Sequence, residues 1–139
     1  MAPRVLISDA LSPAAVAIFK ERGVEVDFQP NLGKDKDKLA AIIGDYDGLA
    51  IRSATKVTAK ILENARNLKV IGRAGIGVDN VDIPMATGRG IIVMNTPFGN
   101  SITTAEHAIA MMFALAREIP AADASTQAGK WEKNRFMGV

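Results

Sequence analysis

Short apolar segments recur at intervals of about 20 residues along the first two thirds of the chain. They are residues 5–7, 24–28, 49–51, 70–71 and 91–94. Each interval is long enough to hold a crossover helix, which favours parallel strand–helix units over hairpins. The pattern predicts an α/β fold: a doubly wound, flavodoxin-like parallel sheet of about five strands with helices on both faces.

The intervals between these segments carry signals at which helices begin and end. Ser12 is expected to cap a helix whose first residue is Pro13, and Gly23 is expected to end it. The other predicted helices run over residues 34–43, from a cap at Thr58, and from Asp79 or Asn80 to Gly88. Together they supply four crossover units.

The segment 101–117 departs from this rhythm, because it is predicted to form one long helix, with a shorter one over residues 121–128 after it. Thr103 and Glu106 have the spacing of a capping box near its start. Its apolar residues lie nearly all the way round: Ile102, Ile109, Met111, Met112, Phe113 and Leu115. Such a helix must be buried on more than one side. We therefore expect the protein to form a homo-oligomer, a dimer or higher, through the 101–117 helix.

Composition and charge narrow the class of protein. The 139 residues are 48% hydrophobic, with 17 basic and 15 acidic residues, so a compact core is expected and nucleic acid is not an expected partner. No cysteine is present, which fits a reducing compartment. The first ten residues lack signal-peptide architecture, and the longest apolar run, 108–116, is shorter than the roughly 20 residues of a membrane span. We expect no membrane segment and a soluble, cytoplasmic protein.

Three loops should meet at the carboxyl edge of the predicted sheet, where open parallel sheets bind ligands. They are residues 52–56, 72–77 and 95–101. Their polar groups are the side chains of Arg52, Ser53, Arg73, Asn95 and Asn100 and the amides near Gly75 and Ile76. Guanidinium groups form charge-assisted bonds to carboxylate and phosphate oxygens, and amides beside glycines can approach an anion closely. The set suits a small anionic substrate.

The glycine-rich loop also invites a dinucleotide interpretation, which its spacing disfavours. Asn80 stands where the third glycine of G-x-G-x-x-G would follow Gly75 and Gly77. Arg52 could equally be a solvated residue at a strand end. Asp79 and Asp82 are interpreted as residues at a helix N-terminus in preference to catalytic acids.

The single histidine does not favour a metal or hydrolase site. His107 follows Glu106 directly, and adjacent helical residues diverge by about 100°, so Glu106 cannot easily orient it. A packed or interface role is expected for His107. With one histidine and no cysteine, no transition-metal site is expected, and the serines have no histidine partner for a hydrolase triad.

Three motifs taken together resemble a known family. RSATKVT at 52–58, GRAGIGVDNVD at 72–82 and NTPFGNSITTAEH at 95–107 are similar to the N-terminal portion of the D-isomer-specific 2-hydroxyacid dehydrogenases. Arg73 and the stretch GKWEKNRFMG at 129–138 favour a member that oxidises a 3-phosphoglycerate-like small anion in serine biosynthesis. The resemblance implies NAD as cofactor.

The resemblance also implies a division of the chain and a role for each motif residue. Residues 1–98 would form the substrate-binding domain, and residues 99–139 would form interdomain helices leading into an NAD-binding Rossmann domain outside this sequence. By motif match, the substrate-binding residues are Arg52, Ser53, Arg73, Gly75 and Asn100, and the residues near the cofactor are Ile76 and Thr104.

The family's catalytic arginine, its acidic partner and its histidine lie downstream of a true G-x-G-x-x-G segment, so the resemblance implies no catalytic residue in this chain. His107 matches the histidine of the Ala-Glu-His motif, not the catalytic one. We expect an N-terminal fragment that is inactive alone. The alternative is a stand-alone anion-binding and self-association module without redox chemistry.

Overall fold

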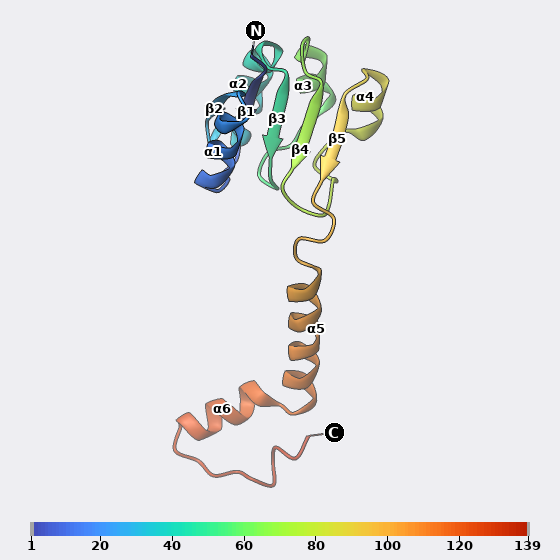
Figure 1. Ribbon diagram of the computed structural model, residues 1–139. Helices are drawn as coiled ribbons and strands as arrows, with labels where there is room; N and C mark the ends of the chain where they lie inside the picture. Colours follow the sequence, from blue (N-terminus) through green and yellow to red (C-terminus); the bar gives the residue numbers. More distant parts are fainter. Residues whose placement is uncertain (1, 139) are drawn as a thin grey trace. The chain divides into compact units, whose positions relative to one another are not determined.

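The computed structural model describes residues 2–138 and divides into two compact units, Met1–Gly99 and Asn100–Val139. The first holds all the strands, and the second is helical (Figure 1). Among residues 2–138, no helix combines the length and the apolar content needed to span a bilayer.

The first unit is built on a sheet of five parallel strands (Figure 1). The strands are β1 (Arg4–Ile7), β2 (Glu25–Phe28), β3 (Gly48–Ile51), β4 (Val70–Arg73) and β5 (Ile92–Asn95). Their spatial order is β2-β1-β3-β4-β5, which is the flavodoxin-like order. The predicted α/β fold class is therefore confirmed.

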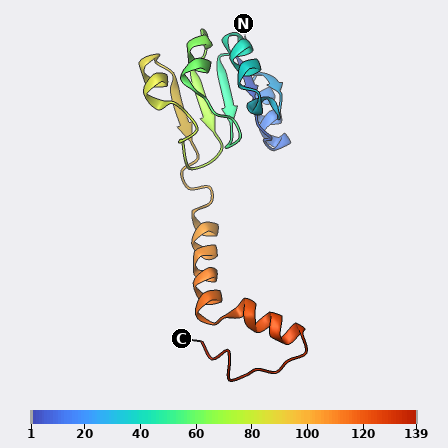
Figure 2. The same cartoon turned by 180° about the vertical axis from the view of Figure 1, so that it is seen from behind.

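Short helices connect the strands. They are α1 (Pro13–Glu21), α2 (Lys36–Ile42), α3 (Ala59–Asn64) and α4 (Ile83–Gly88), with 3-10 turns η1 (Leu32–Lys34) and η2 (Ile43–Asp45) on either side of α2. Helices α2, α3 and α4 stand in a row along the sheet (Figure 2).

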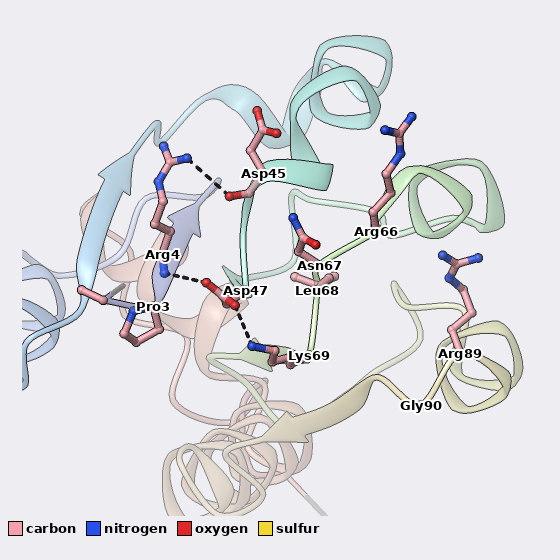
Figure 3. Close-up of a pocket in the computed structure, with 11 residues that line it drawn as sticks. Pro3, Arg4, Asp45, Asp47, Arg66, Asn67, Leu68, Lys69, Arg89 and Gly90 are labelled. Atoms are coloured by element: carbon pink, nitrogen blue, oxygen red, sulfur yellow. Dashed lines mark hydrogen bonds and ion pairs between the residues drawn. The ribbon is translucent and has the colours of Figure 1, made fainter.

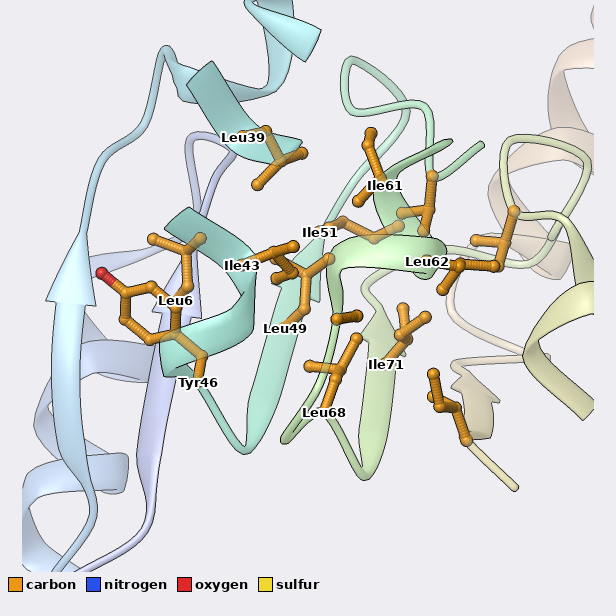
Figure 4. Close-up of a cluster of buried hydrophobic side chains, with 14 of the residues drawn as sticks. Leu6, Leu39, Ile43, Tyr46, Leu49, Ile51, Ile61, Leu62, Leu68 and Ile71 are labelled. Carbon is orange, nitrogen blue, oxygen red and sulfur yellow. The ribbon is translucent and has the colours of Figure 1, made fainter. Parts of the chain in front are cut away.

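Side chains alternate between the two faces of the sheet and form two clusters of unequal size. The larger cluster joins Leu6, Leu49 and Ile71 of the strands to residues of α2, α3 and α4 such as Leu39 and Leu62 (Figure 4). The smaller joins strand residues of β1 and β3 to the apolar side of α1. Helices therefore cover both faces, but unevenly.

The sheet face against which α1 packs is partly exposed. Ile92 and Met94 of β5 point to this face and are 62% and 58% exposed, and they pair with Val70 and Gly72 of β4. Helix α1 packs against β1, β2 and β3, so it does not reach them. Within residues 2–99, no helix covers the outer half of this face.

The helix starts partly match the sequence signals. Ser12 caps α1 by accepting from the Ala14 amide at 3.3 Å, and Gly23 has φ +74° just after its end, as expected. Thr58 stands at the N-cap position of α3 but makes no side-chain cap bond.

The predicted start of the fourth helix at Asp79 or Asn80 is wrong. Helix α4 begins at Ile83, and Asp82 caps it by accepting from the Met85 amide at 3.1 Å. Pro84 explains the difference: it lacks an N–H and would clash with the carbonyl of residue 80 inside a longer helix, but it fits the first turn.

The second unit consists of α5 (Ser101–Ala116) and α6 (Ile119–Gln127), separated at Glu118, which has φ 49°. The long helix is present, but the predicted capping box is not. Asn100 occupies the N-cap position, and Thr103 lies in the first turn, where its hydroxyl donates to the Asn100 carbonyl at 3.0 Å. Helix α5 has no buried residue, and Leu115 is 82% exposed.

Candidate functional site

The predicted loops of the first unit meet at one edge of the sheet, because β3, β4 and β5 are parallel and end in register. Arg73 of β4 pairs with Ile51 of β3 on one side and with Asn95 of β5 on the other. The loops 52–56 and 74–77 start at the next residues. This edge therefore carries five of the predicted site residues: Arg52, Ser53, Arg73, Gly75 and Ile76.

Arg52 is anchored through its backbone and keeps its side chain in solvent. Its N–H donates to Asp9 Oδ2 at 2.5 Å, and its Nη1 donates to the Ala10 carbonyl at 3.4 Å. Ser53 is exposed and lines an open cavity of about 450 Å³, which Asp79, Asn80 and the start of α3 also border. The exposed side chain is compatible with a solvated residue as well as with a binding residue, so both interpretations of Arg52 stay open.

Arg73 lies within the glycine loop, and the loop is shaped around it. A Cβ atom on Gly75 would stand 2.5 Å from Arg73 Nη1, so only glycine allows the guanidinium to lie against the backbone here. Arg73 Nε is buried and has no acceptor among residues 2–138. An unsatisfied buried N–H on a cation is costly and marks a position that an anion would satisfy.

The glycine loop is also connected to the end of β5. The Gly75 carbonyl accepts from the Thr96 amide at 3.0 Å, and the Ile76 carbonyl accepts from Asn95 Nδ2 at 2.7 Å. The Gly75 amide itself donates to the Arg73 carbonyl at 3.0 Å. Within residues 2–138, the amides of Ile76 and Gly77 donate no backbone hydrogen bond and are the free donors of this loop.

A buried polar group supports the 52–55 loop from below, and sequence reasoning missed its role. Asp9 is only 3% exposed, and its Oδ2 accepts from the amides of Arg52 and, at 3.1 Å, Thr55. The hydroxyls of Ser8 and Thr55 form a hydrogen bond with each other, with 2.8 Å between their oxygens, and both side chains are fully buried. The available signal was the position of Asp9 directly after the first apolar segment, at the ligand-binding edge.

Asn80 is the second missed residue. Its Nδ2 donates to the carbonyls of Arg52 at 2.8 Å and Thr55 at 2.7 Å. The sequence places Asn80 at a predicted helix start, whereas in the structure its side-chain amide holds the neighbouring loop. No local sequence signal points to this contact, because it joins residues far apart in the chain.

Two predicted site residues belong to the second unit. Asn100 accepts through its carbonyl from the Thr104 amide at 3.0 Å, and both side chains are exposed. His107 is exposed on α5 as well, so its predicted packing stays a prediction. Contacts of Asn100 with substrate and of Thr104 with cofactor also stay predictions.

A cavity of about 800 Å³ lies at the opposite edge of the sheet (Figure 3). Its charges largely satisfy one another: Asp47 accepts from the Arg4 amide at 3.0 Å and from Lys69 Nζ at 2.9 Å. The hydrogen bond from the Arg4 backbone amide lowers the pKa of Asp47 most, and the hydrogen bond from Lys69 lowers it further. Arg66 and Arg89 follow the ends of α3 and α4, where cations complement the helix dipoles. This cavity is explained by local electrostatics and holds no predicted site residue.

The described residues contain no cluster of side chains suited to bind a metal ion. Among residues 2–138, no three His, Asp or Glu side chains are grouped as a metal ion would require. The chemistry that the carboxyl edge offers is anion binding by arginine and backbone amides.

A family model settles the affiliation of the chain. The model describes the catalytic domain of D-isomer specific 2-hydroxyacid dehydrogenases and matches residues 5–133, which include all three predicted loops. This chain belongs to the D-isomer specific 2-hydroxyacid dehydrogenase family. The resemblance of the motifs to that family is confirmed.

Individual members of this dehydrogenase family are similar over nearly the whole chain. The D-3-phosphoglycerate dehydrogenase of Archaeoglobus fulgidus is 48% identical over 136 residues, which are 98% of this chain and 25% of that protein. The chain thus spans about a quarter of the length of the curated relatives it matches.

Solved structures of related proteins share the fold. The PH0520 protein of Pyrococcus horikoshii OT3 matches with a TM-score of 0.84 at 31% identity, covering 99% of this chain and 40% of that one. The 3-phosphoglycerate dehydrogenase of Entamoeba histolytica, solved with bound NAD+, matches with a TM-score of 0.69 at 31% identity, covering 84% of this chain and 40% of that one.

Proposed function

We propose that this chain is the substrate-binding part of an NAD-dependent D-3-phosphoglycerate dehydrogenase, which oxidises 3-phosphoglycerate to 3-phosphohydroxypyruvate in serine biosynthesis. The observation that carries the proposal is the pair of arginines, Arg52 and Arg73, at the ends of adjacent strands beside free backbone amides. The names of the relatives support the choice of substrate. A cytoplasmic location fits a chain without cysteine.

In this proposal the carboxyl edge binds the anionic groups of the substrate. The exposed guanidinium of Arg52 and the partly buried one of Arg73 bind phosphate or carboxylate oxygens, and Ser53 adds a hydroxyl donor. The main chain at Gly75 and the free Ile76 amide approach the carboxylate. Asn100 contributes from the helical unit. These groups bind and orient the substrate, and none of them exchanges a proton with it.

The residues described here do not fit the pyrophosphate of NAD. Gly75 and Gly77 lack a third glycine at the required spacing. The next helix, α4, begins only at Ile83, so no helix N-terminus follows the loop directly to receive a phosphate. We place NAD mainly in a Rossmann domain outside these residues, with Ile76 and Thr104 at its nicotinamide edge. The chain alone is then expected to be inactive.

The same proposal gives a role to the helical unit. Residues 99–139 are interdomain helices, and α5 forms the contact between subunits of a dimer or higher oligomer. The exposed apolar side chains of α5, among them Ile102, Met112 and Leu115, support this role, because monomers rarely expose so much apolar surface. Analytical sedimentation of this chain should show an oligomer at micromolar concentration. A monodisperse monomer would contradict the proposed role of α5.

The decisive experiment measures NADH formation by the full-length protein with 3-phosphoglycerate and with unphosphorylated 2-hydroxy acids. Arg73→Ala is expected to raise KM for 3-phosphoglycerate by about 10- to 100-fold, through the loss of a charge-assisted bond. Arg66→Ala, at the opposite edge, is the matched control and should leave KM unchanged.

Each other result has a defined meaning. Turnover of another 2-hydroxy acid, but not of 3-phosphoglycerate, would refute the substrate assignment. Binding of 3-phosphoglycerate without any NAD reduction would favour the alternative, an anion-binding and self-association module without redox chemistry.

A further inference from the structure

Asn80 and Asp9 hold the 52–55 loop from two sides. Asn80 Nδ2 donates both of its hydrogens, to the carbonyls of Arg52 and Thr55 at 2.8 and 2.7 Å. Asp9 Oδ2 accepts from the amides of the same two residues at 2.5 and 3.1 Å. Two side chains therefore satisfy four backbone groups of a loop that belongs to no helix or strand.

These contacts also join the two loops that carry the arginines. Asn80 belongs to the segment 72–82 that contains Arg73, and its carbonyl accepts from the Val57 amide at 2.8 Å. Asp82 then donates its amide to the Val57 carbonyl at 2.9 Å. The 52–55 loop and the end of the glycine-loop segment thus share a continuous set of hydrogen bonds.

We propose that Asn80, together with Asp9, is a positioning residue that fixes the 52–55 loop, and with it Arg52 and Ser53, relative to Arg73. The functional consequence rests on the proposed substrate binding at this edge. Two anion-binding groups on separate loops act together only when their spacing is held, because each freely moving loop must be ordered again when the ligand binds.

The chemistry of the contact requires an amide at position 80. A carboxylate has the same shape but no hydrogen to donate, and it would face two carbonyl oxygens. Asn80→Asp therefore removes both bonds without changing volume. The acceptor at position 9 is less demanding, because Asp9→Asn can still accept through one oxygen.

Asn67 provides a matched control. Its Nδ2 also donates to a carbonyl across the fold, that of Gly44 at 2.8 Å, at the opposite edge of the sheet. Asn67→Asp removes the same kind of bond from a loop with no proposed role in binding.

The test uses the full-length protein and two independent measurements. Hydrogen exchange of peptides covering residues 51–57 reports the loop itself, and it should be at least about tenfold faster in Asn80→Asp and unchanged in Asn67→Asp. Steady-state kinetics should show KM for 3-phosphoglycerate raised roughly tenfold in Asn80→Asp, with kcat and KM for NAD within about twofold of wild type. Asp9→Asn should be milder than Asp9→Ala in both measurements.

The possible results separate the two proposals. Wild-type exchange and KM in Asn80→Asp would overturn the positioning role, and so would equal losses in kcat and in both KM values. Faster exchange in a protein whose wild type does not oxidise 3-phosphoglycerate would keep the loop assignment and refute the proposed function. If Asn80→Asp does not fold, Asn80→Ser retains one donor and should give an intermediate effect, and no effect would overturn the proposal.

Discussion

The sheet unit and the helical unit contain similar apolar side chains in opposite environments. Leu6 and Ile71 of the sheet are fully buried, whereas Ile102 and Leu115 of α5 are 75% and 82% exposed. Helices cover the strands on at least one face, whereas α5 contains no buried residue. The pattern of apolar residues therefore predicts where a helix or strand forms. How much these side chains contribute to stability depends on the elements that pack against them.

The largest expected effect comes from truncating one apolar side chain in each unit. Ile71→Ala should lower the free energy of unfolding by about 2–5 kcal/mol, because it opens a cavity in the core between the sheet and α3. Leu115→Ala should change it by less than about 0.5 kcal/mol in the monomer. Urea denaturation at low protein concentration measures both. Equal losses would mean that the two environments do not differ as described.

A second contrast lies within the sheet unit, between a packed glycine and an open one. A Cβ on Gly33 would overlap the Thr55 hydroxyl and lie 2.9 Å from Asp9 Oδ1, so Gly33→Ala should cost about 1–3 kcal/mol. A Cβ on Gly72 meets nothing within 4 Å, so Gly72→Ala should be neutral or slightly stabilising. Thermal melting of both variants gives the comparison, and a stable Gly33→Ala would contradict the close packing.

Helix caps provide a third and smaller contrast. Asp35 caps α2 by accepting from the Lys38 amide at 3.0 Å, so Asp35→Ala should cost about 1 kcal/mol. Asn100 makes no side-chain cap bond at the start of α5, so Asn100→Ala should leave stability nearly unchanged. If Asn100 contacts the substrate as proposed, the same variant should still raise KM. A loss of stability without a change in KM would argue for a purely structural Asn100.

The smallest contrast concerns the single tyrosine of the sheet unit and the single tryptophan of the helical unit, which can be followed by spectroscopy. Tyr46 of the sheet unit is 5% exposed, whereas Trp131 of the helical unit is 85% exposed. Burial, and then the hydrogen bond that Tyr46 donates to Asp27 at 2.5 Å, raise the pKa of Tyr46 to about 12. Because the unfolded phenol ionises near pH 10, this contribution to stability is complete below about pH 10 and is lost as the pH rises through about 12.

Absorbance titration of the chain, which contains a single tyrosine, follows this ionisation directly. Tyr46→Phe serves as the blank and should abolish the transition. A midpoint near 10 in the folded chain would show that the phenol is not protected.

Most of the sheet could be predicted from sequence because buried parallel strands are short apolar segments at regular spacing. The start of α4 could not be predicted from the polar residues Asp79 and Asn80 alone. Pro84 decides where that helix can begin, and its effect extends four residues back along the chain.

The position of Arg52 and Arg73 at the carboxyl edge of the sheet was predictable, because Arg52 directly follows β3 and Arg73 is the last residue of β4. Asp9 and Asn80 were not recognised, because their contacts join residues 43 and 28 positions apart. Such contacts depend on the folded arrangement of β1, β3 and the glycine loop, and one sequence carries no periodic signal for them.

Gly33 restricts which part of the sheet edge is open to a ligand. In sheets of this strand order, a ligand commonly enters between the first and third strands, where the direction of winding reverses. Here the chain itself fills that place: Gly33 donates its amide to the Ser8 carbonyl at 3.0 Å, and Leu32 and Gly33 are buried. The part of this edge that stays open follows β3, β4 and β5, where we propose that the anion binds and where Arg52 and Ser53 are exposed to water. Ion pairs are weak in water, so residues 2–99 alone should hold an anion only loosely, and tight binding requires a second surface that excludes solvent.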